Sequence, residues 1–459
     1  MADQEKNKNN IENRWTWLDS GVAAPKGFFA TGVQAGIKYQ NKYDVALIYS
    51  DRMAQAAGVF TRNKVKAHPL VLTQKHLEDG QAQAVVVNSG NANACVGEAG
   101  DQAALAMACE TAKCLGLKTE DVLVTSTGVI GVEMPVVRVV SGIQAAAAEI
   151  KKLVGTNSSL LEAGVQADTD SKAKAETKVK SEVDNEAKTG SEAEARALVH
   201  EHGTLAARAI MTTDTTLKQV AGELGCKSGV IRVGAMAKGS GMIHPNMGTM
   251  LGFITTDAAV DHAELKDLLV QAVDESFNMV TVDGDTSTND MVVILANGAS
   301  GVTPEGEELE AFKELVSEIC VKLAQEIARD GEGATKLIEV KVLGAESVDG
   351  ARQIAKAICG SSLVKAAIFG EDANWGRILA AAGYSGADFN PDLVDIYLGD
   401  VIVASEGRGL NFSEEKAKEV LEQKEIVITV NLNSGQDSAT AWGCDLTHEY
   451  VTINGKYRT

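Results

Sequence analysis

The segment Lys238-Gly-Ser-Gly-Met-Ile-His-Pro-Asn-Met-Gly-Thr-Met-Leu251 lies near the middle of a chain of 459 residues. Its glycines and its proline break both helical and strand periodicity, so we expect neither structure within it. Gly248 precedes Thr249, and an apolar run from Met250 to Ile254 predicts a buried strand directly afterwards. Glycine can adopt the strained backbone geometry in which a hydroxyl attacks the preceding carbonyl. The segment is compatible with self-cleavage before Thr249, and equally with a glycine-rich turn that enters a core strand.

Cleavage at this point would make Thr249 a new N-terminus, with an α-amine beside its own hydroxyl. The reference pKa of an α-amine is about 7.7–8.0, so a sizeable fraction is neutral near neutral pH and can act as a base. A threonine activated by its own N-terminal amine is a recognised nucleophile. The dipeptide Gly248-Thr249 is too short to establish this chemistry alone, so the interpretation depends on other segments.

Further motifs occur along the chain, and they are Ala24-Pro-Lys-Gly-Phe28, Asn88-Ser-Gly-Asn-Ala-Asn-Ala-Cys95, Ser126-Thr-Gly-Val-Ile-Gly131, Ile210-Met-Thr-Thr-Asp-Thr215, Val282-Asp-Gly-Asp-Thr-Ser-Thr-Asn-Asp290, Asp330-Gly-Glu-Gly-Ala-Thr-Lys336, Asn374-Trp-Gly-Arg377, Asp445-Leu-Thr447 and Tyr450-Val-Thr-Ile-Asn454. Together with the central segment, they resemble the ornithine acetyltransferase family, the glutamate N-acetyltransferases of arginine biosynthesis. The resemblance covers nearly the whole chain apart from residues around 155–197. One position departs from the family, which usually has alanine before the nucleophile where this chain has Gly248.

The resemblance implies a layered α/β sandwich of the ornithine acetyltransferase, N-terminal-nucleophile-like type, assembled from two autoprocessed subunits. These would be an alpha subunit of residues 1–248 and a beta subunit of residues 249–459, in the α2β2 heterotetramer that the family suggests. The alternation of strand-like and helix-like runs is compatible with this fold but does not select it over other α/β folds. Residues 157–194 change in character, and within them residues 166–182 are low in complexity and nearly free of large apolar side chains. We expect a disordered or mobile surface insertion there rather than a solvated helix.

The implied reaction moves the acetyl group of N2-acetyl-L-ornithine to L-glutamate, which gives L-ornithine and N-acetyl-L-glutamate. It would follow a ping-pong path through an acetyl-Thr249 ester and would need no cofactor. Some family members also take the acetyl group from acetyl-CoA, and the sequence leaves open whether this chain does. Two other functions stay open. One is an N-terminal-threonine aminopeptidase or amidase of related architecture, and the other is a non-catalytic binding protein left uncleaved because of Gly248.

A short apolar run at residues 122–125 predicts a strand that delivers Ser126, Thr127 and Gly128 to a loop. Such a loop can fix a hydroxyl and a backbone N–H towards a ligand, although an ordinary turn fits the same residues. By resemblance, the Thr127 hydroxyl and the Gly128 N–H form the oxyanion hole. Removing one such donor typically costs about 2.7–4 kcal/mol.

The resemblance also assigns substrate-binding positions, which are Thr212 (with Thr213 as its close alternative), Lys238, Thr249, Glu332, Asn454 and Thr459. A lysine can meet a carboxylate as a point charge, and a carboxylate suits the cationic side chain of ornithine. By composition alone, Lys238 and Glu332 fit solvated groups as well. We expect the C-terminal tail to be ordered against the site, although chain ends usually fray.

Three stretches carry clear secondary-structure patterns. Apolar residues recur at helical spacing and predict a core helix, and they are Phe312, Leu315, Val316, Ile319, Leu323 and Ile327. After the turn Asp330-Gly-Glu-Gly333, apolar and charged residues alternate from Ile338 to Val342 and predict a half-buried strand. An alanine-rich helix is predicted over residues 101–115, with Asp101 as its cap.

The amino-acid composition excludes several classes of binding partner and site. The formal net charge of −20 argues against nucleic acid or an anionic membrane surface as a partner. Seven cysteines without Cys-x-x-Cys spacing favour neither a disulfide framework nor a zinc site. The loop from Asp283 lacks the glutamate that ends an EF-hand calcium loop, since Ile294 falls there, so we expect no metal site. The polar N-terminus does not resemble a signal peptide, and no segment is apolar enough to span a membrane. A cytoplasmic location fits best.

Overall fold

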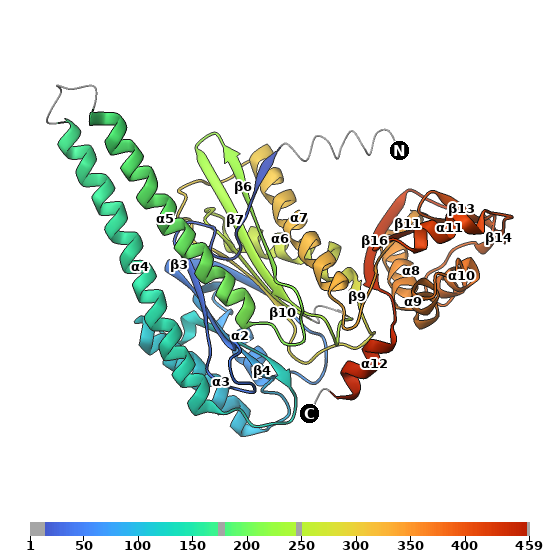
Figure 1. Cartoon of the computed structure of the whole chain (residues 1–459), viewed down its shortest axis with the longest axis horizontal. Helices are drawn as coiled ribbons and strands as arrows, with labels where there is room; N and C mark the ends of the chain where they lie inside the picture. The colour runs from blue at the N-terminus through green and yellow to red at the C-terminus, as the bar shows by residue number, and fades with distance from the viewer. Residues whose placement is uncertain (1–13, 173–179, 245–249, 457–459) are drawn as a thin grey trace.

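The computed structural model describes residues 14–172, 180–244 and 250–456. Within them, a nine-stranded mixed sheet forms the main body and a seven-stranded sheet forms a C-terminal lobe (Figure 1). In spatial order, the strands of the main sheet are β1 (Trp15–Leu18), β6 (Lys218–Cys226), β7 (Gly229–Lys238), β8 (Leu251–Thr256), β10 (Met291–Ala296), β3 (Val45–Phe60), β4 (Gln81–Asn91) and β5 (Val122–Val129), with β2 (Phe28–Val33) paired to β3. β8 and β10 are parallel, as are β4 and β5.

The two halves of the main sheet share an apolar core. Val85 and Val87 of β4 belong to the same cluster as Phe253 of β8. The alternate residues Ala84 and Val86 belong to a second cluster with α3 and α4. Because successive side chains of a strand point to opposite faces, β4 is covered on both sides. The main sheet thus provides two stacked sheet layers.

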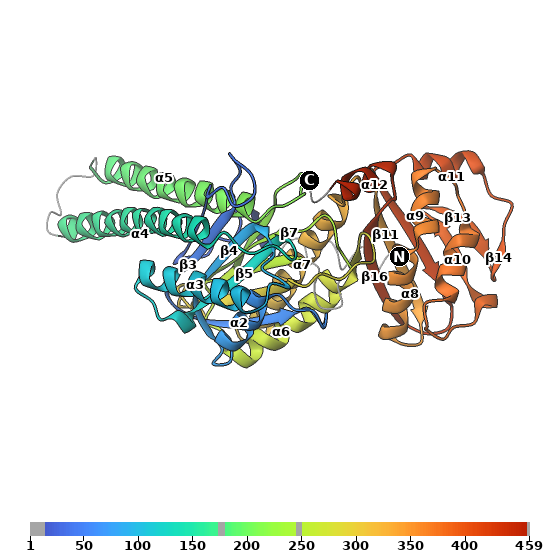
Figure 2. The same cartoon turned by 90° about the horizontal axis from the view of Figure 1, so that it is seen from below.

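Helices cover the outer faces of both sheet layers (Figure 2). α6 (His262–Glu275) and α7 (Glu307–Arg329) pack on the layer that holds β7, β8 and β10. α3 (Glu98–Leu115) and the first part of α4 (Val136–Lys172) pack on the layer that holds β3, β4 and β5, and α2 (His68–His76) lies against β5. This helix–sheet–sheet–helix order confirms the predicted layered α/β sandwich.

The C-terminal lobe is built on a second mixed sheet. Its strands are, in spatial order, β14 (Arg408–Gly409), β13 (Val401–Ser405), β12 (Asp395–Leu398), β15 (Glu425–Asn431), β11 (Leu337–Ala345), β16 (Asp437–Cys444) and β9 (Val280–Thr281). Its helices are α8 (Val348–Gly360), α9 (Ser362–Phe369), α10 (Trp375–Gly383), α11 (Glu414–Leu421) and α12 (His448–Gly455). α12 returns from this lobe to the main body (Figure 1).

Two predicted elements are confirmed. The six apolar residues that predict the core helix are all buried in α7. Acidic residues occupy the first turn of α7 and Arg329 its last turn, as the helix dipole favours. In β11, Ile338, Val340 and Val342 are fully buried while Glu339 and Lys341 are partly exposed. Local apolar spacing was sufficient to place both elements.

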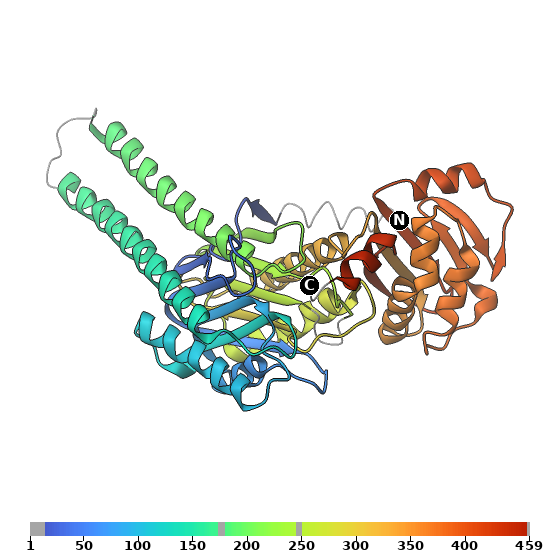
Figure 3. The same cartoon turned by 60° about the horizontal axis from the view of Figure 1, so that its bottom comes forward.

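The expectation of an insertion without regular structure at residues 157–194 is wrong for the backbone that the structure describes. α4 continues to Lys172, and α5 (Lys180–Ala209) returns beside it. The two helices project beyond the sheets (Figures 1 and 3). Alanine, lysine and glutamate are abundant in this stretch and have high helix propensity, which explains its helical backbone.

The predicted cap of the alanine-rich helix is also wrong. α3 begins at Glu98, after the cap residue Gly97. Asp101 lies one turn inside the helix, where its Oδ1 is 2.7 Å from His68 Nδ1. Among the described residues, no helix combines the length and apolar character needed to cross a membrane.

Candidate active site

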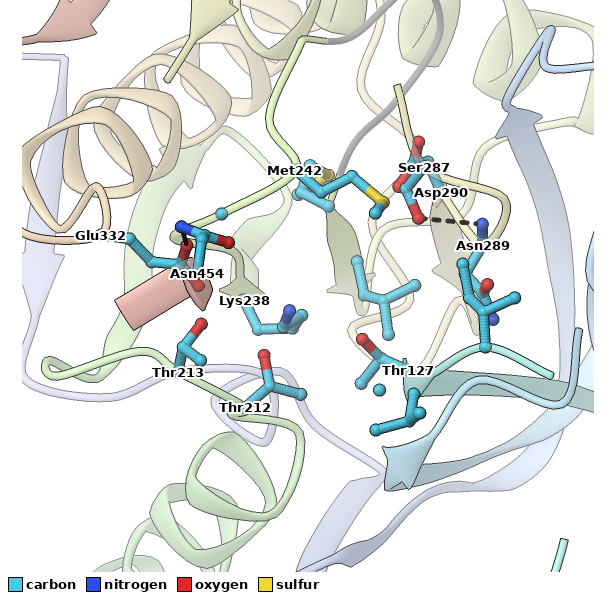
Figure 4. Close-up of a pocket in the computed structure, with 16 residues that line it drawn as sticks. Thr127, Thr212, Thr213, Lys238, Met242, Ser287, Asn289, Asp290, Glu332 and Asn454 are labelled. Carbon is cyan, nitrogen blue, oxygen red and sulfur yellow. Dashed lines mark hydrogen bonds between the residues drawn. The ribbon is translucent and has the colours of Figure 1, made fainter. Parts of the chain in front are cut away.

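A cavity of about 290 Å³ opens where β5, β7, β8 and α12 meet. Its walls are formed by Thr127, Gly128, Val129, Ile130, Thr212, Thr213, Lys238, Gly241, Met242, Met250, Leu251, Ser287, Asn289, Asp290, Glu332 and Asn454. Glu332, Asn454 and Thr213 lie at one end, Thr127, Asn289 and Asp290 at the other, and Lys238 between them (Figure 4). The structure thus collects, from distant parts of the chain, all the predicted site residues that it describes.

Thr127 and Gly128 lie inside strand β5 rather than in the loop that the sequence predicts. They pair with Ser89 and Gly90 of β4, because β5 runs on to Val129. Gly128 has φ of +136°, and a Cβ atom at this position would lie 2.3 Å from the backbone carbon of Gly90. Only glycine fits so close a backbone approach at positive φ. Both residues line the cavity.

A buried hydrogen-bond network holds this part of β5. Ser126 Oγ donates to Asn88 Oδ1 at 2.5 Å, and Asn88 Nδ2 donates to the Asn91 carbonyl at 2.9 Å. From the opposite wall, Asn289 Nδ2 donates to the carbonyls of Ser126 and Ala92 at 2.8 and 2.7 Å. Buried amides satisfied in this way specify a rigid arrangement. The motif beginning at Asn88 therefore supports the segment that carries Thr127.

A chain of buried charges lies behind the cavity wall. Lys218 Nζ donates to Asp214 Oδ1 at 2.9 Å and to Asp330 Oδ2 at 2.5 Å, and its side chain is fully buried. Lys238 Nζ, on the cavity side, is 4.0 Å from Asp214 Oδ2. Burial alone would raise the pKa of Asp214, but the two lysines outweigh it and hold that pKa well below its ordinary value. Buried charges are tolerated when paired in this way.

Asp214 also holds the loop of Thr212 and Thr213. Asp214 accepts the Thr212 N–H at 2.9 Å, and Thr213 Oγ1 is 2.8 Å from Ser240 Oγ. Lys42 Nζ donates to the Thr212 carbonyl at 2.6 Å. Burial lowers the pKa of Lys42, although Asp214 opposes this effect. Both threonines line the cavity, so the choice between them stays open.

Glu332 and Asn454 meet at the far end. Glu332 follows α7 in the predicted turn, and its backbone N–H donates to the Ser240 carbonyl at 2.8 Å. Asn454 Nδ2, on α12, donates to Glu332 Oε2 at 2.7 Å. A Cβ atom on Gly241 would lie 2.3 Å from this carboxylate, so the glycine leaves space for it. The C-terminal helix and the turn after α7 therefore form one wall.

The segment that leads to the predicted cut is held by the loop from Asp283, whose sequence superficially resembles a calcium-binding loop. Asp283 accepts the N–H groups of Met242 at 2.6 Å and Ile243 at 2.8 Å. Thr286 Oγ1 donates to the His244 carbonyl at 2.9 Å. In the described part of the chain, no group of three or more His, Cys, Asp or Glu side chains is arranged to hold a metal ion. Asp283 acts here as an acceptor for the backbone.

Three predicted residues lie outside the described residues, namely Gly248, Thr249 and Thr459. The residues that follow Thr249 in the chain are described. Met250 and Leu251 line the cavity, and Leu251 begins β8.

Asp290 is the residue that sequence reasoning missed most clearly. It lines the cavity and is 2% exposed. Burial raises its pKa well above the ordinary value, although Ser287 and Lys238 oppose this. Asn289, Ser287, Met242, Asp214 and Lys218 were missed as well. The motif that ends at Asp290 was a signal, but its spacing does not separate side chains that face the cavity from those that hold the loop.

Comparison with known proteins gives a consistent family. The sequence model of the ArgJ family matches residues 29–459. The arginine biosynthesis bifunctional protein ArgJ of Symbiobacterium thermophilum is 51% identical over 96% of this chain and 100% of its own length. The protein of the same name from Caldanaerobacter subterraneus subsp. tengcongensis is 47% identical over 96% of this chain and 99% of its own length.

A solved structure shares sequence with part of the chain. It is an ornithine acetyltransferase from Mycobacterium tuberculosis, in complex with ornithine. That chain is 34% identical, with a TM-score of 0.38, and the match covers 50% of this chain and 98% of the solved one.

Proposed function

This chain belongs to the ArgJ family of bifunctional acetyltransferases in arginine biosynthesis, and we propose that it transfers an acetyl group from N2-acetyl-L-ornithine to L-glutamate through an acetyl-Thr249 ester. The single observation that carries this proposal is the cavity. It gathers Thr127, Gly128, Lys238 and Glu332 around the start of β8, directly after residue 249. A nucleophile at that position would have oxyanion donors at one end and substrate-binding groups at the other.

Self-cleavage would prepare the nucleophile. Thr249 Oγ attacks the carbonyl carbon of Gly248, the C–N bond breaks, and the nitrogen gains a proton to become an amine. Water then hydrolyses the ester, which leaves a carboxylate on Gly248 and restores the Thr249 hydroxyl. The products are residues 1–248 and 249–459. Both parts contribute strands to the main sheet, which supports their staying together after cleavage.

The first half-reaction forms the acetyl-enzyme. Thr249 Oγ attacks the acetyl carbonyl of acetylornithine and gives its proton to the Thr249 α-amine. Thr127 Oγ1 and the Gly128 N–H stabilise the oxyanion. The C–N bond then breaks, its nitrogen gains a proton, and ornithine leaves. In the second half-reaction, the glutamate amine attacks the ester and loses a proton, the C–O bond to Thr249 breaks, Oγ regains a proton, and N-acetylglutamate leaves.

The opposite end of the cavity would select the substrate. The Glu332 carboxylate suits the cationic side chain of ornithine, and Lys238 suits a substrate carboxylate. Thr212 or Thr213, Asn454 and Thr459 would add hydrogen bonds. Because Lys238 is 4.0 Å from Asp214, its charge is held in place before a substrate arrives, which reduces the ordering that binding requires.

The first test is an intact mass of the purified protein under denaturing conditions, followed by an acetyl-transfer assay. We expect two fragments whose masses place the cut between Gly248 and Thr249, and an added acetyl group on the second fragment after incubation with acetylornithine. Thr249→Ala should remain a single chain and take up no acetyl group. A wild-type chain that stays whole and transfers nothing would overturn the proposal.

The acceptor is tested separately. Acetylornithine consumption should depend on glutamate, whereas an aminopeptidase or amidase would release free acetate without it. Acetylation of glutamate from acetyl-CoA alone would establish a second donor. We propose an α2β2 assembly, as the family suggests, and a cytoplasmic location, which the cysteine pattern favours. Light scattering of the cleaved protein tests the assembly.

A further inference from the structure

Asp290 is buried at the reaction end of the cavity with an unused oxygen. Among the described residues, its Oδ2 has no hydrogen-bond partner. Its backbone is fixed, because its carbonyl accepts the Thr61 N–H at 3.0 Å and the next residue, Met291, donates to the Met250 carbonyl at 3.2 Å. A buried carboxyl oxygen without a hydrogen-bond partner destabilises a fold unless a ligand supplies the partner. A group of this kind in a cavity points to a role with the ligand.

The register of the two parallel strands places Asp290 beside the start of β8. Met291 pairs with Leu251, so Asp290 is level with Met250, and both residues line the cavity with Thr127 and Gly128. Figure 4 places the Asp290 side chain at the same end as Thr127. The scissile bond of a substrate whose acetyl oxygen points to Thr127 and Gly128 would lie at this end.

We propose that the Asp290 carboxyl group is the general acid that protonates the leaving amine in the first half-reaction, and the base that accepts a proton from the attacking amine in the second. This inference rests on the proposed acetyl-transfer function. Burial raises the pKa of Asp290, which favours the protonated form that a general acid needs and so supports the geometry. A carboxylic acid kept neutral by an apolar site is an established device for donating a proton.

The proton balance closes over the two half-reactions. In the first, Thr249 Oγ–H gives its proton to the α-amine, the substrate C–N bond breaks, and its nitrogen takes the Asp290 proton. The acetyl-enzyme then carries an α-ammonium and an Asp290 carboxylate. In the second, the acceptor amine forms the new C–N bond and gives a proton to Asp290. The C–O bond to Thr249 breaks, and Oγ recovers its proton from the α-ammonium.

Few charges face Asp290 in the cavity. The other titratable side chains that line it are Lys238, from the end of β7, and Glu332, from the turn after α7. Lys238 is already near Asp214, and Glu332 lies at the opposite end (Figure 4). Ser287 and Asn289, from the loop before β10, are uncharged. Asp290 is therefore the carboxyl group at the reaction end among the described residues.

The test compares two acetyl donors whose leaving groups differ in their need for a proton. Acetylornithine must lose an amine, whereas an activated aryl acetate loses a stable phenolate. In Asp290→Asn, we expect formation of the acetyl-enzyme from acetylornithine to fall by about 100-fold or more. The burst of phenolate from the aryl acetate should stay within about threefold of wild type, since this step needs no general acid. Transfer from the acetyl-enzyme to glutamate should again be slow.

Asp257→Asn is the matched control. Asp257 is also buried and has a pKa raised by burial, but it accepts the backbone N–H groups of Lys26 and Arg232 at 2.9 and 2.8 Å and does not line the cavity. We expect this variant to lose stability and to keep the wild-type ratio of the two donor rates. If Asp290 had only a structural role, Asp290→Asn and Asp257→Asn would both keep the wild-type ratio of the two donor rates.

The wild-type enzyme gives a second test that needs no variant to fold. The rate with acetylornithine should fall as pH rises through the pKa of Asp290, because the acid form is consumed, while the aryl acetate burst should show no such limb. Equal pH profiles for the two donors would overturn this inference and leave the proposed function intact. The same holds for an Asp290→Asn variant in which the rates with both donors fall equally, or in which neither rate falls. Absence of any acetyl-enzyme in the wild type would overturn the proposed function together with it.

Discussion

Asn454 Nδ2 donates a hydrogen bond to Glu332 Oε2 at 2.7 Å, across 122 residues of sequence. The contact joins α12 to the turn after α7 and closes one end of the cavity. Because Glu332 is 7% exposed, its carboxylate depends on such partners for its orientation. The C-terminal helix thereby takes part in the site, although it comes from the far lobe of the molecule.

Asn454→Ala should weaken substrate binding more than it weakens the fold. Loss of one hydrogen bond to a charged group corresponds to about 1.5–3 kcal/mol, so we expect KM for acetylornithine to rise about 10- to 100-fold with a smaller change in kcat. Thr452→Ala is the control, since Thr452 is exposed on the same helix and its Oγ1 donates to the His448 carbonyl at 3.2 Å. Equal KM values for the two variants would contradict a role for Asn454 at the substrate.

Thr127→Val should reduce kcat without unfolding the protein. Valine has the shape of threonine and lacks the hydroxyl, so the variant tests the proposed oxyanion donor directly. Loss of one donor should lower kcat by about 10²–10³-fold, while Thr127→Ser should recover most of the rate. Steady-state kinetics and a melting curve of each variant check this. A Thr127→Val enzyme with wild-type kcat would remove the hydroxyl from the mechanism.

Gly128→Ala should be more damaging, because the new Cβ atom would lie 2.3 Å from the backbone carbon of Gly90. Neither backbone can move away without breaking the pairing of β4 with β5. We expect a lower melting temperature and loss of the acetyl-enzyme together. Gly131→Ala is a useful comparison, since this glycine also has positive φ but a Cβ atom there would meet nothing within 4 Å.

Lys218→Met should strongly destabilise the protein. The substitution leaves Asp214 and Asp330 buried without the cation between them, and breaking a buried pair costs about 3–5 kcal/mol. The free energy of unfolding in urea, measured in the uncleavable Thr249→Ala background, gives the value for a single chain. Lys313→Met removes a surface lysine that pairs with Glu264 at 2.8 Å and should cost less than about 1 kcal/mol. Similar losses for both lysines would show that the buried chain of charges is not a stabilising unit.

The sequence predicted those elements whose pattern is local. The apolar stripe of α7 and the alternation in β11 each arise from residues within a few turns or a few strand positions, so spacing alone identifies them. The end of β5 was placed in a loop because Ser126, Thr127 and Gly128 are polar or small. In the structure, long-range pairing with β4 keeps them in a strand, and this partner is not visible in the local pattern.

Site residues could be predicted where the family resemblance assigned them a role. Residues whose role depends on burial in the folded chain could not be predicted. Lys218 and Asp330 are 112 residues apart, and only the fold turns them into a buried pair. Asp290 reads as the last polar residue of a turn, whereas its importance comes from a buried oxygen without a described partner. No spacing pattern identifies such residues, because an aspartate is the same residue in the sequence whether the fold buries it or leaves it in solvent.

His244 should make stability depend on pH. Burial, with Lys356 as a second cause, lowers its pKa to about 4, compared with about 6.5 in an unfolded chain. Between these values the unfolded chain binds more protons, so the free energy of unfolding rises with pH. The stabilisation is fully present above about pH 6.5 and is lost as the pH falls towards about 4.

The magnitude can be measured with one substitution. His244 Nδ1 is 2.9 Å from Thr281 Oγ1, and His244→Asn offers a non-titrating polar group for the same partner. Because the ring is partly exposed, we expect the pH-dependent contribution to be about 1–3 kcal/mol. Urea unfolding of the Thr249→Ala chain with and without His244→Asn should give two curves of stability against pH that lie close together at neutral pH and separate in acid, where only the chain with His244 loses this contribution. Parallel curves over this range would mean that another group carries the acid sensitivity, and that the segment before the proposed cut does not sense pH through His244.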